Sequence, residues 1–72
     1  MSEISIKLGQ VIRDRRKSRG LSQEELAFKS GLHRTYISQI ERGLKSLTVE
    51  TLFKLGKTLG ARPSELIADT EH

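Results

Sequence analysis

LSQEELAFKSGLHRTYISQIERG, residues 21–43, is the stretch that decides the fold, because its small and apolar residues recur at the spacing of two helices joined by a tight turn. Ala27 stands where two helices would cross closely, and a larger side chain would push them apart. Gly31 follows four residues later and can adopt the positive φ that a sharp turn requires. Ile37 and Ile40 give the second helix a buried face. This segment is therefore predicted to be a helix-turn-helix.

Helical patterns continue on both sides of this segment. Ser22 with Glu25 three residues later is a capping-box pattern, which starts the first motif helix at about Gln23. The helices are predicted at roughly 5–19, 23–30 and 33–42, then from Thr48 to Gly60, and finally in a short segment starting at Pro63. No segment alternates as a strand should. The sequence predicts an all-α fold of five helices, with the motif at about 22–42.

Length and composition limit the classes of protein that this chain can belong to. With 72 residues it is predicted to be one domain, 1–72. It has no cysteine, and His33 and His72 make no metal-binding pattern, so we expect neither a metal nor another cofactor. No apolar run approaches the roughly 18 residues of a membrane helix, and the N-terminus lacks a secretion signal. A cytoplasmic location is expected.

The charge of the chain is positive and unevenly distributed. It has 13 Lys and Arg against 9 Asp and Glu, a formal net charge of +4. Basic residues cluster at Arg13, Arg15, Arg16, Lys17 and Arg19, and again at Arg34, Arg42 and Lys45, whereas Glu65, Asp69 and Glu71 follow Pro63. A basic surface of this kind suits a nucleic acid as partner.

Residues 21–43 and their flanking helices resemble the Cro and lambda-repressor-like (XRE-type) DNA-binding domains. The resemblance covers nearly the whole chain, and the phrase HRTYIS followed by IERG is most similar to the controller proteins of restriction-modification systems. It implies a five-helix lambda-repressor-like fold and a sequence-specific transcriptional regulator, activator or repressor, acting as a homodimer on a two-fold symmetric operator. The implied partners are double-stranded operator DNA, a second copy of the chain and RNA polymerase.

Four polar residues on the outer face of the second motif helix are the candidate base readers: Arg34, Thr35, Ser38 and Gln39. An α-helix fits the major groove, where Arg34 can donate two bonds to guanine and Gln39 can pair with adenine. The Thr35 methyl group can contact a thymine methyl. The alternative is that this face is polar only because it is solvated.

Five residues are candidates for phosphate contacts, which fix the register of the reading helix: Gln23, His33, Tyr36, Arg42 and Lys45. Gln23 lies in the first turn of its predicted helix, where free amides favour an anion, and the resemblance implies that it is the phosphate-binding position of the family. His33 and Tyr36 match family positions near the DNA backbone. Tyr36 has the alternative of packing its ring on the preceding helix, and Lys45 that of being simply solvated.

The resemblance also implies a structural ion pair between Arg16 and Glu41. Dimerisation is expected at the far end of the molecule, through Leu52, Leu55, Leu66 and Ile67. Periodicity alone does not separate core residues from interface residues in this set, so part of it can belong to the core.

Three alternatives remain at the level of the sequence. A phage-type repressor or an antitoxin regulator would share the same phrase. A protein-interaction module could keep the fold without binding DNA. An enzyme is not expected, because the chain has no cysteine, no glycine-rich phosphate loop and no paired histidines.

Overall fold

The computed structural model describes residues 2–71, and within that range the chain forms five helices and no strand. The helices are α1 (Glu3–Ser18), α2 (Gln23–Ser30), α3 (Arg34–Glu41), α4 (Val49–Leu59) and α5 (Pro63–Thr70). The predicted all-α fold with five helices is thereby confirmed.

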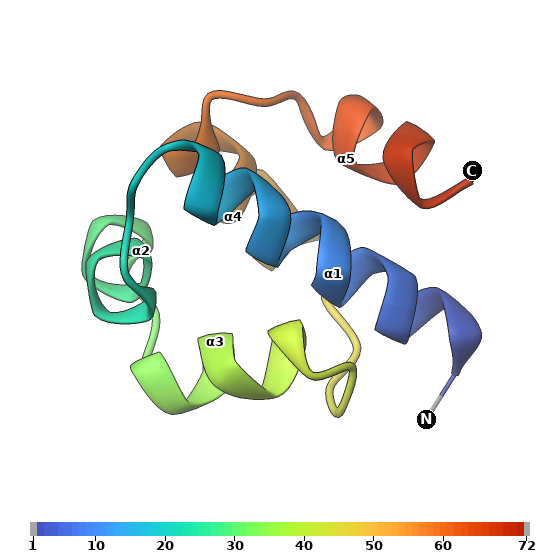
Figure 1. Cartoon of the computed structure of the whole chain (residues 1–72), viewed down its shortest axis with the longest axis horizontal. Helices are drawn as coiled ribbons and strands as arrows, with labels where there is room; N and C mark the ends of the chain where they lie inside the picture. Colours follow the sequence, from blue (N-terminus) through green and yellow to red (C-terminus); the bar gives the residue numbers. More distant parts are fainter. Residues whose placement is uncertain (1, 72) are drawn as a thin grey trace.

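Helix α1 is the central element of the arrangement. It packs against α3, α4 and α5, while α2 packs against α3 and α4. Figure 1 shows α3 and α5 on opposite sides of α1, with both described ends of the chain at the same side of the molecule. The outer side of α3 is therefore left uncovered by α5.

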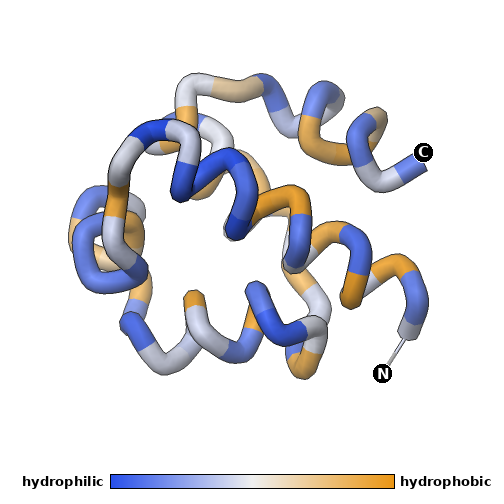
Figure 2. The backbone as a smooth tube through the Cα atoms, in the orientation of Figure 1, coloured by the Kyte–Doolittle hydropathy of each residue, from blue (hydrophilic) through white to orange (hydrophobic). Residues whose placement is uncertain are grey.

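The core is built from one apolar face of each helix. Its fully buried large side chains are Ile12, Leu26, Ile37, Ile40, Leu55 and Leu66. Each such side chain contributes roughly 1.5–3 kcal/mol by leaving water. Hydrophobic and hydrophilic stretches alternate along α1 in Figure 2, as expected for a helix with one buried face. Every helix of the described residues therefore contributes a side chain to one common core.

The helix ends follow from local capping. Helix α1 begins at Glu3 rather than at the predicted Ser5, because the Ser2 side chain accepts a hydrogen bond from the Ser5 amide at 3.0 Å. Thr48 caps α4 in the same way, and Pro63 is the first residue of α5, both as predicted. Helix α3 is shorter than predicted by one residue at each end, since His33 and Arg42 are its flanking caps.

Candidate nucleic-acid interface

Helices α2 and α3 form the predicted motif through a cap, a small residue and a glycine turn. Glu25 donates its amide to Ser22 Oγ at 3.0 Å, and Ser22 donates its amide to Glu25 Oε1 at 2.9 Å, which completes the capping box. Gly31 ends α2 with φ 70° and ψ 32°, a left-handed conformation that favours glycine. Ala27 is buried beside this turn. These local features set the orientation of α3 relative to α2.

Helix α3 presents two chemically different faces. Ile37 and Ile40 anchor its inner face in the core. Arg34 and Thr35 lie on the exposed side of its first turn, and the Arg34 side chain is 63% exposed. Ser38 and Gln39 are half-buried. The four predicted base readers therefore lie on one short helix, with the first two fully accessible to a ligand.

The predicted phosphate-contacting residues lie around this helix. Gln23 is the first residue of α2 and is half-buried, and His33 is the exposed N-cap of α3 without a side-chain capping bond. Tyr36 is half-buried and packs against the core cluster. Arg42 and Lys45 are exposed at and after the end of α3. The structure thus places these five residues at both ends of α3 and at the start of α2.

An acidic residue lies beside Arg34, one of the two exposed residues among the predicted base readers. The Arg34 Nε atom is 3.9 Å from Glu24 Oε1, and the Glu24 side chain is 80% exposed. An ion pair this open to water contributes only about 0–1 kcal/mol. The guanidinium of Arg34 is therefore free to leave Glu24 for a stronger partner.

The Arg16–Glu41 ion pair joins α1 to the end of α3. Arg16 donates from Nε to Glu41 Oε2 at 2.7 Å and from Nη2 to Oε1 at 2.9 Å. The two side chains are only 9% and 3% exposed. The hydrogen bond to Glu41 raises the pKa of Arg16, burial lowers it, and the charge of Glu41 raises it again, with a net upward shift. Arg16 therefore stays charged in the folded protein.

Two structural contacts were not foreseen from the sequence. Gly9 of α1 packs directly on the backbone carbonyls of Ile40 and Glu41, so that α1 and α3 cross with no room for a side chain at this position. Arg15 donates from Nε and Nη2 to Asp69 Oδ2 at 3.2 and 2.8 Å, which ties α1 to α5. A small residue inside an otherwise regular helical stripe was the available signal for Gly9.

The expected dimer residues require a correction. Leu55 and Leu66 are fully buried and Leu52 is 8% exposed, so these three side chains belong to the core of the chain itself. They are buried in one common cluster because α4 packs on α2, α5 and α1, and α5 packs on α1. Of the expected set, Ile67 alone is accessible, at 40%.

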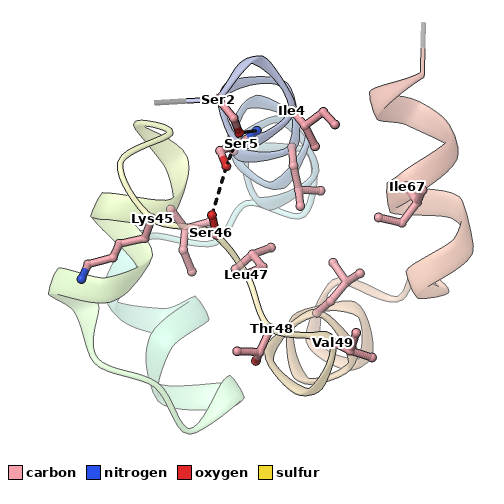
Figure 3. A pocket seen from close by; sticks show the side chains of 13 residues that line it. Ser2, Ile4, Ser5, Lys45, Ser46, Leu47, Thr48, Val49 and Ile67 are labelled. Atoms are coloured by element: carbon pink, nitrogen blue, oxygen red, sulfur yellow. Dashed lines mark hydrogen bonds between the residues drawn. The ribbon is translucent and has the colours of Figure 1, made fainter.

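A different set of apolar side chains is exposed at this end. Val49 and Phe53 lie one turn apart on α4 and are 72% and 59% exposed. Ile4, Val49 and Ile67 surround a largely apolar cleft between the start of α1, the 45–48 loop and α5 (Figure 3). We call Ile4, Val49, Phe53 and Ile67 the apolar end face.

Metal-binding clusters and membrane-spanning helices are both absent from the described part of the chain. Residues 2–71 contain no group of three or more His, Cys, Asp or Glu side chains arranged to hold a metal ion, and His72 lies outside the described residues. None of the described helices has both the length and the apolar character needed to cross a membrane.

The fold and the exposed α3 face define a helix-turn-helix DNA-binding protein. Residues 12–66 match the helix-turn-helix family, and the chain belongs to this family of DNA-binding transcriptional regulators, which is not a class of enzymes. It is 43% identical over 67 residues to the control protein C.BamHI of Bacillus amyloliquefaciens. The aligned region covers 92% of this chain and 83% of that protein.

Solved structures agree with this assignment. The restriction-modification controller protein C.AhdI of Aeromonas hydrophila superposes with a TM-score of 0.84 at 44% identity, covering 86% of this chain and 94% of that one. SinR, a master regulator of biofilm formation solved in complex with DNA, superposes with a TM-score of 0.80 at 36% identity, covering 83% and 97%. The chain is therefore similar both to controller proteins and to a DNA-bound regulator.

Proposed function

We propose that this chain is a controller protein of a restriction-modification system, which binds a two-fold symmetric operator as a homodimer in the cytoplasm. The observation that carries the proposal is the uncovered face of α3, where Arg34 and Thr35 are exposed in the first turn of the helix. The similarity to C.BamHI and C.AhdI supports the controller role over that of a phage-type repressor or an antitoxin regulator.

Helix α3 reads bases in the major groove. Arg34 donates two hydrogen bonds to guanine O6 and N7, and the Thr35 methyl group contacts a thymine methyl. Ser38 and Gln39 lie one turn further on and are half-buried, so they reach only those base edges that lie directly under the helix. The net positive charge of the chain supports DNA binding over a protein-interaction module.

Phosphate contacts hold the reading helix in register. Gln23 and the first amides of α2 bind one phosphate group, since a helix N-terminus favours an anion. His33 and Tyr36 donate from the start of α3, and Arg42 and Lys45 contact the DNA backbone from its other end. Because Arg42 and Lys45 are the basic side chains of this group, the release of counterions on DNA binding makes them set most of its salt dependence.

The apolar end face is the dimer interface. Its four side chains include a phenylalanine that is 59% exposed, and pairing with the same face of a second copy would remove them from water. Dimerisation is needed because one short helix contacts only a few base pairs, each worth about 1–3 kcal/mol of discrimination. Two linked copies would read half-sites about 34–36 Å apart.

Selection of duplexes from a random pool tests the proposal directly. We expect an inverted repeat, and its sequence then serves in titrations on matched and mismatched duplexes at several salt concentrations. Arg34→Ala should weaken binding by about 1–3 kcal/mol per subunit and relax the preference at one base pair of each half-site. Lys45→Ala should weaken all sequences alike and reduce the salt slope by about one per subunit. Recovery of no preferred sequence would refute sequence-specific regulation.

Sedimentation over a range of protein concentrations tests the dimer. Phe53→Ser should shift the chain towards the monomer, whereas Phe28→Ser is the matched control, because Phe28 is even more exposed but lies on α2, outside the apolar end face. A monomer at all concentrations, free and on the operator, would exclude the two-fold arrangement. Equal effects of the two variants would exclude this face.

A further inference from the structure

The buried carboxylate of Glu41 contacts two other helices at once. Its Oε2 atom accepts from Arg16 Nε at 2.7 Å, and its Oε1 atom accepts from Arg16 Nη2 at 2.9 Å. The same Oε1 atom also accepts from Gln23 Nε2 at 3.1 Å. Since Gln23 is the first residue of α2, the ion pair between α1 and α3 extends to the end of α2 that faces the proposed phosphate.

Arg16 also contacts the backbone just before the start of α2. Its Nη1 atom donates to the carbonyl oxygen of Leu21 at 2.8 Å, one residue before the Ser22 N-cap. The first turn of α2 is thus fixed by a backbone contact just before the cap and by a side-chain contact just after it. Both contacts start from the same buried ion pair.

The contact with Glu41 determines which way the Gln23 amide points. A glutamine amide carries two N–H donors and one oxygen acceptor, and it can otherwise rotate to present either end to a ligand. Because one N–H of the Gln23 amide donates to Glu41, the amide nitrogen stays on that side. Its second N–H remains available as a donor. Rotated by half a turn, the amide would present its oxygen to the phosphate, where no hydrogen bond can form.

Arg16 makes this arrangement compatible with DNA. A lone carboxylate beside a phosphate would repel it, but the guanidinium neutralises the charge of Glu41 at 2.7 Å. The carboxylate therefore acts on DNA only through the orientation of Gln23.

We infer that Glu41 is a positioning residue for DNA binding, which orients the Gln23 side-chain amide so that it donates to a phosphate oxygen. This inference rests on the proposed phosphate contact of Gln23. It assigns to the ion pair a role in affinity beyond that of joining α1 to α3.

The test compares two variants that share the loss of the ion pair. In an Arg16→Met background, Glu41→Gln keeps an amide oxygen that can accept from Gln23, whereas Glu41→Met removes every acceptor. We expect Gln23→Ala in the otherwise unchanged chain to weaken operator binding about tenfold per subunit, close to the lower end of the range for a hydrogen bond to a charged group. Arg16→Met/Glu41→Met should lose a similar factor, and Arg16→Met/Glu41→Gln should recover most of it.

A further Gln23→Ala substitution separates the positioning role of Glu41 from the phosphate contact of Gln23. It should cost little in the Arg16→Met/Glu41→Met background, because the amide there is already unoriented. An undiminished tenfold loss in that background would overturn the positioning role and leave the phosphate contact standing. If Gln23→Ala has no effect in the unchanged chain, the phosphate contact itself is wrong, and the positioning role fails with it. Circular dichroism establishes that each variant is folded at the temperature of the titration.

A measurement on the unchanged chain avoids dependence on any variant. Nitrogen-15 relaxation of side-chain amides should show the Gln23 amide to be more ordered than that of Gln10, an exposed glutamine on α1, in the absence of DNA. The same order should persist in the complex. Equal mobility of the two amides in the free protein would overturn the inference.

Discussion

Replacing Arg16 by methionine should destabilise the chain far more than the same replacement at Arg15. Both arginines lie near the end of α1 and both donate twice to a carboxylate on another helix. Arg16 and Glu41 are 9% and 3% exposed, whereas Arg15 and Asp69 are 33% and 41% exposed. The two variants therefore differ in whether the remaining carboxylate is reached by water, and Arg16→Met also removes the hydrogen bond from Arg16 to the Leu21 carbonyl oxygen.

The magnitudes follow from that difference. Arg16→Met leaves the Glu41 carboxylate buried with only Gln23 as donor, which should cost about 3–5 kcal/mol. Arg15→Met leaves Asp69 open to solvent and should cost at most about 1 kcal/mol. A chain of 72 residues has a free energy of unfolding of roughly 4–11 kcal/mol at about 0.05–0.15 kcal/mol per residue. Loss of Arg16 therefore removes a large part of the total stability.

Urea unfolding followed by circular dichroism measures both effects, at one fixed protein concentration because the proposed dimerisation would add to the apparent stability. The double variant Arg16→Met/Glu41→Met should regain most of the loss, since an apolar pair carries no unpaired charge. Similar losses for Arg15→Met and Arg16→Met would refute the argument from burial. A double variant no more stable than Arg16→Met would show that Arg16 stabilises the fold by other contacts.

Three further predictions concern single positions. Gly9→Ala should destabilise the fold by about 1–3 kcal/mol, because the new methyl group meets the backbone of Ile40, and thermal melting measures the loss. Leu66→Ala should cost about 2–5 kcal/mol in urea unfolding even under conditions where the chain is monomeric, since this side chain is core; an effect confined to the dimer would return it to the interface. Hydrogen bonds from Ser22 lower the pKa of Glu25. The ionised Glu25 therefore stabilises the folded protein above the ordinary pKa of 4.5, and this contribution is lost as the pH falls through the lowered pKa. Glu25→Gln should therefore flatten the acid side of the stability profile, and an unchanged profile would contradict this.

The elements of the fold were predictable because their signals are local. The capping box at Ser22 and Glu25, the turn at Gly31 and the start of α5 at Pro63 each depend on residues within one turn of the chain. The same holds for the outward polar face of α3, which is simply the side opposite Ile37 and Ile40. Only the helix ends shifted, by a residue or two, where caps such as Ser2 compete with neighbouring positions.

The sequence by itself determined that residues 2–71 form five helices, where the chain turns between α2 and α3, and which polar residues lie on the outer face of α3. Only the tertiary structure decided that Leu55 and Leu66 are core while Ile67 is exposed, and that the Glu41 carboxylate contacts Gln23. The physical reason is that periodicity identifies the apolar face of a helix but not the surface that this face meets. That surface is set by segments far apart in the sequence, whose positions are fixed only when the helices pack together.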